Sequence, residues 1–171
     1  MRTTRLLSGL WLLTVAGLIA LWVWAAITLP ASVPLHLDFS GEATRWGSRW
    51  ELLGVLGVAA LFTVGLPWVI AAVIRRGGAL TFVNIPFKQW WLATPRRERE
   101  VRHRLAVDMV AISMLTAWMF IGALGEVIAL AGGPAAFGWF RWLWLSAMGV
   151  IFVYSVVASV LRYRPDKEWA G

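Results

Sequence analysis

The sequence contains no cysteine, so disulfides, thiol nucleophiles and cysteine-based metal sites are excluded. Charged residues are also scarce, at 15% of the 171 residues, whereas soluble proteins have about 25%. Hydrophobic residues make up 60%, which leaves too little polar surface to cover a water-soluble core. Much of the surface is therefore expected to face lipid. The 13 Trp agree, because indole rings favour the membrane–water interface.

Long apolar runs predict four transmembrane helices, at about residues 6–29, 50–74, 105–131 and 142–161. Each run can cross a hydrocarbon core of about 30 Å at about 1.5 Å per residue. Every backbone N–H in lipid needs an internal partner, so the runs are expected to be helical. The first run is too long for the apolar part of a signal peptide and is expected to remain as an anchor. The expected fold class is therefore an all-α integral membrane protein, with residues 1–171 forming one four-helix transmembrane domain.

The distribution of basic residues predicts the orientation. All but Arg45, Arg49 and Arg141 of the 16 Lys and Arg lie before the first run, between the second and third, or after the fourth. Positive segments stay in the cytoplasm, so both termini and a basic loop at 75–104 are expected there. An extended loop at 30–49 is then external. Because these residues act as topology signals, the net charge of +7 does not indicate a nucleic-acid partner.

Several local signals predict where helices begin and bend. Ser48 followed by Glu51 is typical of a capping box at the start of the second span. Thr94-Pro95 predicts an N-cap, with a helix that runs unbroken into the third span. Pro67 is expected to bend the second span, because proline lacks an N–H and clashes with the preceding turn. Ion pairs at i,i+4 spacing are expected between Glu98 and Arg102, Glu100 and Arg104, and Arg104 and Asp108.

The external loop carries the densest set of candidate site residues. Apolar and polar residues alternate over Val33–Phe39, so an extended chain would place His36 and Asp38 on one face. With Glu42, these side chains offer ligands for a divalent cation or a route for a proton. A structural alternative is that Asp38 and Glu42 pair with Arg45 and Arg49 while the apolar residues rest on the helix ends. A third interpretation is recognition of a partner, with Trp46 as an additional contact.

The amino-acid sequence of this loop resembles that of a known family. Leu29-Pro30-x-x-Val33-Pro34-x-His36, Gly41-Glu42 and Trp46-Gly47-Ser48-Arg49 resemble a bacterial membrane domain of unknown function. That domain also forms the N-terminal module of SdpI-type toxin-immunity and signalling proteins. Asn84-Ile85-Pro86-x-Lys88-x-x-Trp91-Leu92 is similar to the family's cytoplasmic motif. The resemblance implies protection from a secreted membrane-active toxin, although the immunity proteins are longer and Thr44 and Arg49 depart from the pattern. It therefore predicts a bacterial plasma membrane as the location, and it predicts the architecture more directly than immunity.

The cytoplasmic loop combines aromatic and basic residues. One interpretation is a docking surface for a cytoplasmic protein, formed by Lys88, Trp90, Trp91, Arg96 and Arg97. The alternative is anchoring to anionic lipid, at about 1 kcal/mol per basic residue near the surface.

Ionisable residues inside the spans are costly and need partners. Asp108 lies near the inner end of the third span, where Arg104 is expected to neutralise it. Glu126 lies near the outer end of the same span, and Arg141 opens the fourth after a short connection. We expect a Glu126–Arg141 ion pair that ties the two spans together. The alternative is participation in a polar pathway through the membrane.

These patterns predict a binding or sensing protein, immunity-like or accessory, that recognises an extracytoplasmic peptide or protein through its external loop. Two other classes stay open: a subunit of a membrane transporter or channel, and a metal-assisted membrane enzyme that uses His36, Asp38 and Glu42. No nucleophile-plus-base constellation is visible elsewhere, so enzymatic activity is not the preferred expectation. The expected partners are the lipid bilayer and proteins on either side, and no cofactor is expected.

Overall fold

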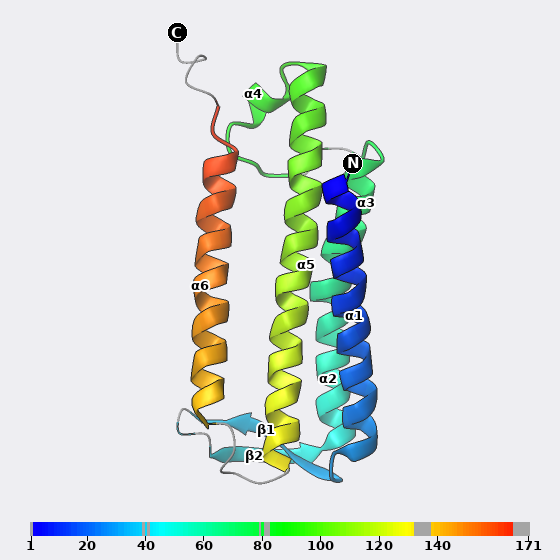
Figure 1. Cartoon of the computed structure of the whole chain (residues 1–171), viewed down its shortest axis with the longest axis vertical. Coiled ribbons are helices and arrows are strands. Elements are labelled where there is room, and N and C mark those ends of the chain that lie inside the picture. Colours follow the sequence, from blue (N-terminus) through cyan, green and yellow to red (C-terminus); the bar gives the residue numbers. More distant parts are fainter. Residues whose placement is uncertain are drawn as a thin grey trace.

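The computed structural model is a bundle of long helices with a small hairpin at one end (Figure 1). It describes residues 2–38, 40, 42–78, 80, 83–131 and 138–165, and of residues 2–5, 138–141 and 159 only the backbone. The long elements are α1 (Arg2–Thr28), α2 (Arg49–Ala60), a π-helical segment η1 (Leu61–Gly65), α3 (Leu66–Arg75), α5 (Pro95–Ala131) and α6 (Gly138–Arg162). The short ones are β1 (Ser32–Leu37), β2 (Ala43–Ser48) and α4 (Lys88–Leu92). Four of the described helical stretches are long and apolar enough to cross a membrane, as predicted.

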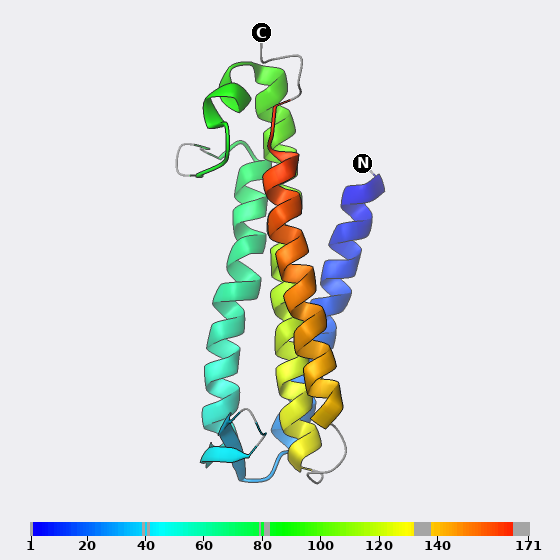
Figure 2. The same ribbon diagram turned by 90° about the vertical axis from the view of Figure 1, so that its left-hand side faces the viewer.

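The two ends of the bundle differ, and we call them the hairpin end and the α4 end (Figures 1 and 2). The β1–β2 hairpin lies at the first, while α4, the start of α1 and the last turn of α6 lie at the second. Because the start of α1 and the last turn of α6 lie at the same end, the chain crosses the bundle an even number of times, which agrees with the predicted four spans.

Two of the predicted helix starts are confirmed by their caps. The Ser48 hydroxyl accepts a hydrogen bond from the Glu51 N–H at 3.0 Å, which satisfies a free donor at the start of α2. The Thr94 hydroxyl accepts from the Arg97 N–H at 3.4 Å, and α5 runs from Pro95 through the third span without interruption. The Glu51 carboxylate does not complete the predicted capping box but pairs with Arg45 instead.

Pro67 changes the winding of the second span rather than only bending it. The five residues of η1 end two positions before it and form a π-helix. Proline at 67 offers no N–H to the Thr63 carbonyl one turn before, and its ring crowds that carbonyl. The Thr116 hydroxyl of α5 donates to this carbonyl at 2.9 Å, and the Ser113 hydroxyl donates to the neighbouring Val64 carbonyl at 2.6 Å. Side chains of α5 thus satisfy backbone groups that lipid cannot.

Helix α5 is the centre of the bundle and contributes to every cluster of buried apolar residues described. With α1, β1 and α2 it forms a cluster at the hairpin end that contains Ala25, Leu29, Val33, Leu53, Leu124 and Val127. With α3 and the 80–91 segment it forms another at the α4 end. Helix α6 is different, because none of its described side chains between Trp142 and Arg162 is buried. It rests on α5 through Trp144, which occupies the space over Gly122.

Candidate functional site

The predicted external loop forms an antiparallel hairpin in the structure. Strand β1 pairs with β2, with Val33 opposite Gly47 and His36 opposite Arg45, and the register is irregular on both sides of His36. Asp38 closes the turn: its carboxylate accepts from the Ser40 hydroxyl at 2.6 Å and from the Glu42 N–H at 2.9 Å. The Asp38 N–H also donates to the Glu42 carbonyl at 3.0 Å. Asp38 therefore has a structural role in shaping the tip.

The inner side of the hairpin is fixed to the helices by apolar packing. Val33 is fully buried against Leu29 and Leu53, and Leu35 packs against the same cluster. Gly47 allows this contact, because a Cβ there would overlap the Leu35 side chain and lie 2.7 Å from the Glu51 carboxylate. The hairpin is therefore a rigid part of the bundle and not a tether between two helices.

Arg49 fastens the base of the hairpin. The Arg49 guanidinium donates to the Leu29 carbonyl at 2.7 Å, and the backbone N–H of Arg49 donates to the Ala31 carbonyl at 3.2 Å. The guanidinium also lies 5.1 Å from the centre of the Trp50 ring. The Leu29 carbonyl is one of the free acceptors at the end of α1, so Arg49 satisfies a group that would otherwise be left unpaired. This explains, in physical terms, why the motif ends in a long cationic residue.

The outer side of the hairpin is open. Trp46 is 61% exposed, and His36 is exposed beside Arg45 across the strand pair. Arg45 pairs at 2.7 Å with Glu51, so the predicted pairing of Arg45 with Asp38 or Glu42 is wrong. Arg49 likewise turns to the Leu29 carbonyl rather than to these carboxylates. The exposed groups of the hairpin are thus the Trp46 ring, the His36 imidazole and the Arg45–Glu51 ion pair, whose Glu51 carboxylate lies on the Gly47 side.

His36, Asp38 and Glu42 do not form a metal site. Among the described residues, no group of three His, Cys, Asp or Glu side chains is placed to hold a metal ion. The Asp38 carboxylate is occupied by the turn, where it accepts from the Ser40 hydroxyl and the Glu42 N–H. The geometry therefore gives no support to the metal-assisted enzyme.

The predicted Glu126–Arg141 pair lies outside the described residues, because only the backbone of Arg141 is described. Glu126 is half-buried in α5 near the hairpin end and has an interaction partner. The ion pair stays a prediction.

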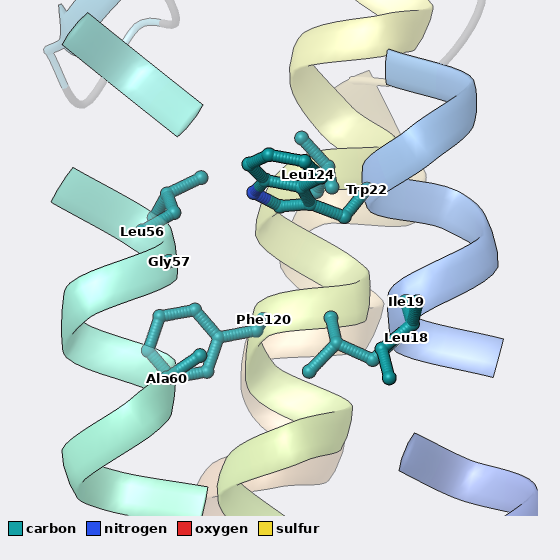
Figure 3. A pocket seen from close by; sticks show the side chains of 8 residues that line it. All are labelled: Leu18, Ile19, Trp22, Leu56, Gly57, Ala60, Phe120 and Leu124. Carbon is teal, nitrogen blue, oxygen red and sulfur yellow. The ribbon is translucent and has the colours of Figure 1, made fainter. Parts of the chain in front are cut away.

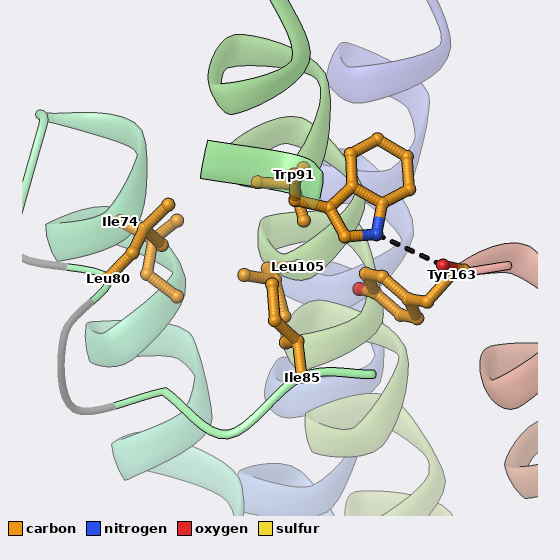
Figure 4. Close-up of a cluster of buried hydrophobic side chains, with 7 residues drawn as sticks. Ile74, Leu80, Ile85, Trp91, Leu105 and Tyr163 are labelled. Atoms are coloured by element: carbon orange, nitrogen blue, oxygen red, sulfur yellow. Dashed lines mark hydrogen bonds between the residues drawn. The ribbon is translucent and has the colours of Figure 1, made fainter. Parts of the chain in front are cut away.

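At the α4 end the structure brings together residues that lie far apart in the sequence. The Asp108 carboxylate accepts from the Arg162 guanidinium at 2.6 Å and from the Tyr163 hydroxyl at 2.7 Å. The Trp91 indole N–H donates to the Tyr163 carbonyl at 3.0 Å, as Figure 4 shows, and Arg104 donates to the Arg162 carbonyl. We call these five residues the α4-end cluster. It joins α4, α5 and the end of α6.

The predicted Arg104–Asp108 pair is wrong, since Arg162 and Tyr163 satisfy Asp108. Arg104 instead pairs with Glu100 at 2.8 Å and lies 4.9 Å from the centre of the Trp91 ring. Asp108 is 8% exposed and Tyr163 is 4% exposed. Burial, and then the hydrogen bond to Asp108, raises the pKa of the Tyr163 hydroxyl well above its usual range. Tyr163 therefore stays protonated and remains a donor to Asp108.

The proposed docking residues of the 75–104 connection divide into two groups. Trp91 is buried and belongs to the core of the α4 end, so it offers no surface to a partner. Arg96 is exposed, Lys88, Trp90 and Arg97 are half-buried, and the Arg97 guanidinium lies 4.2 Å from the centre of the Trp90 ring.

The predicted Glu98–Arg102 pair is present at 2.6 Å. Arg102 also donates to the Ile74 carbonyl at 3.4 Å and to the Gly78 carbonyl, so it caps the end of α3.

Comparison with known proteins assigns part of this chain. Residues 12–61 match the family described as "Domain of unknown function (DUF1648)". The match includes most of α1, the whole hairpin and α2, and it ends before Asn84–Leu92. The link to SdpI-type proteins and the second motif therefore stay predictions. No curated protein and no solved structure matches the chain significantly. The segment that is similar to this family thus comprises the hairpin and the two helices that hold it, within an architecture of four candidate membrane spans.

Proposed function

We propose that this protein recognises a peptide or protein partner through the outer side of its hairpin, in a sensing or immunity-like accessory role. The observation that carries the proposal is the exposed Trp46 on a rigid hairpin. Exposed aromatic rings on preorganised elements are the residues from which binding hot spots are built. His36 and Arg45, with its exposed ion pair to Glu51, supply polar groups on the same hairpin that can select among partners.

The orientation is part of this proposal. We infer that the hairpin end faces outward and that the α4 end, which carries most of the basic residues, faces the cytoplasm. The chain has no Cys, so single Cys variants report their own position. In intact cells, Ala31→Cys should react with a membrane-impermeant maleimide, and Arg164→Cys should react only after the membrane is opened. The reverse pattern would refute the orientation.

A transporter or channel subunit is supported less well. The charged Asp108 is held in the α4-end cluster by Arg162 and Tyr163 rather than standing along a path. The intramembrane cavity described in the next section is apolar and is lined by neither Asp108 nor Glu126. A permeating ion would find few groups there to replace its water.

Site-specific photo-crosslinking tests the recognition proposal. Benzoylphenylalanine at the exposed position of Thr44 should capture a partner in living cells, and Trp46→Ala or His36→Ala in the same chain should abolish the product. Trp142→Ala is the matched control, because Trp142 is also half exposed at the hairpin end but lies on α6. It should leave the product unchanged.

Thermal stability in detergent must be measured for the same variants. The recognition proposal expects Trp46→Ala and His36→Ala to unfold at the wild-type temperature, because both side chains are exposed. If the crosslinked product falls only in proportion to lost stability, or if Trp142→Ala abolishes it equally, the hairpin is a structural cap.

A further inference from the structure

A cavity of about 200 Å³ lies within the membrane-spanning part of the bundle, between α1, α2 and α5 (Figure 3). Phe120 and Leu124 of α5 line it on one side, and Leu18 and Trp22 of α1 on another. On the α2 side the lining includes Gly57 and Ala60. The volume exceeds that of apolar cavities of about 150 Å³ that take up a benzene-sized molecule.

The lining offers a ligand no hydrogen bond. Among the lining side chains only Trp22 carries a polar atom, the indole nitrogen, which donates to the Leu53 carbonyl at 3.3 Å. The remaining lining side chains are aliphatic, phenyl or glycine. A polar molecule would lose its own hydrogen bonds on entry, at a cost of about 2–7 kcal/mol per group. The ligand that fits is a hydrocarbon.

The position of the cavity indicates the source of that hydrocarbon. Ala60 lies 11 residues after the start of α2, so the cavity is about 10–16 Å below the hairpin end at 1.5 Å per residue. That is the depth of the acyl chains of one leaflet in a core of about 30 Å. Ile19, which also lines the cavity, is 58% exposed, so its rim reaches the lipid-facing surface.

We propose that this cavity holds an acyl chain of a bilayer lipid from the hairpin-side leaflet, as a bound lipid and not a transient neighbour. Gly57 makes the space available. A Cβ at this position would already lie 3.7 Å from the Trp22 nitrogen, so a longer side chain would enter the cavity. The proposal does not rest on recognition by the hairpin, because its evidence is the lining and depth of the cavity alone.

Photolabelling by lipid in nanodiscs tests the proposal. The whole chain is reconstituted with a phosphatidylcholine that carries a diazirine near the middle of one acyl chain, irradiated, and mapped by mass spectrometry. Labelling of Leu18, Ile19 and Leu56 should exceed that of Val150, which is 69% exposed on α6 and reports ordinary lipid contact. Gly57→Leu should reduce the cavity labels to the Val150 level.

Gly54→Leu is the matched control. It adds the same side chain one turn away, where a Cβ would meet no atom within 4 Å, and it should leave the cavity labels unchanged. Ala60→Leu is a second blocking variant, and it decides the outcome if Gly57→Leu fails to fold. Equal labels at the cavity and at Val150, insensitive to both blocking variants, would overturn the proposal.

Discussion

The two ends of the bundle share apolar packing but differ in their ion pairs. At the α4 end, a buried carboxylate collects donors from the end of α6, and a buried indole and an arginine add bonds to the backbone beside it. At the hairpin end, the inner side is held by apolar packing and the only ion pair described there, Arg45–Glu51, is exposed. The ion pair at the α4 end therefore includes a buried carboxylate, whereas both partners of the ion pair at the hairpin end are exposed.

This difference suggests what each end is for. Buried polar groups stabilise one arrangement strongly, since losing any partner leaves an unpaired group. They suit a structural fastening, and they are needed because α6 has no buried side chain among those described in its span. Exposed polar groups on a packed base contribute little to folding and stay available for a partner. The comparison can be tested by removing one element from each end.

The largest effect is expected for Asp108→Ala. The change leaves the Tyr163 hydroxyl and the Arg162 guanidinium without their acceptor, in a site where Asp108 is 8% exposed. Arg162 is partly exposed and can regain water, so we expect a loss of about 3 kcal/mol, at the lower end of the range for a broken buried pair. Thermal unfolding in detergent measures it. Glu100→Ala, which removes an exposed partner from the same helix, should change stability by about 0.5 kcal/mol or less. Equal losses would refute the contrast.

A smaller but clear effect is expected for Gly47→Ala at the hairpin end. The added methyl overlaps Leu35, so the strand or the side chain has to move, at about 1–3 kcal/mol for overpacking. Gly54→Ala adds the same methyl in open space and should be neutral or slightly stabilising within the helix. Thermal unfolding of both variants, measured in the same detergent, distinguishes overpacking at Gly47 from a general intolerance of alanine.

The smallest effect is expected for the exposed Arg45–Glu51 pair. Arg45→Gln and Glu51→Gln should each cost less than about 1 kcal/mol, because the side chains are 67% and 43% exposed and the pair is screened by water and salt. The double variant should cost no more than the sum, and a double-mutant cycle measures the coupling. A coupling energy similar to the loss for Asp108→Ala would show that the hairpin end is also fastened by charge.

The spans could be predicted from the sequence because hydropathy and length depend on local composition. The caps at Ser48 and Thr94 were predictable for the same reason, since the donors lie three residues away. The partner of Asp108 was not, because Arg162 is 54 residues further along and Arg104 has the ideal local spacing. Strand β2 was also missed. Its residues 43–48 show no apolar alternation, and it forms because β1 is fixed beside it.

The π-helical segment before Pro67 has a consequence for how this span tolerates change. A π-helix bonds over five residues rather than four, so one deletion within 61–65 restores α-helical winding and keeps the register, whereas one deletion within α2 rotates everything after it by about 100°. Trp68 would leave its stack on Trp11, whose ring centre is 5.0 Å away, and the Ile74 carbonyl would turn from Arg102. Substitutions at the lipid-facing Leu61 and Phe62 leave these contacts in place. The second span should therefore accept many changes of residue type, and a deletion at 61–65 but not within α2.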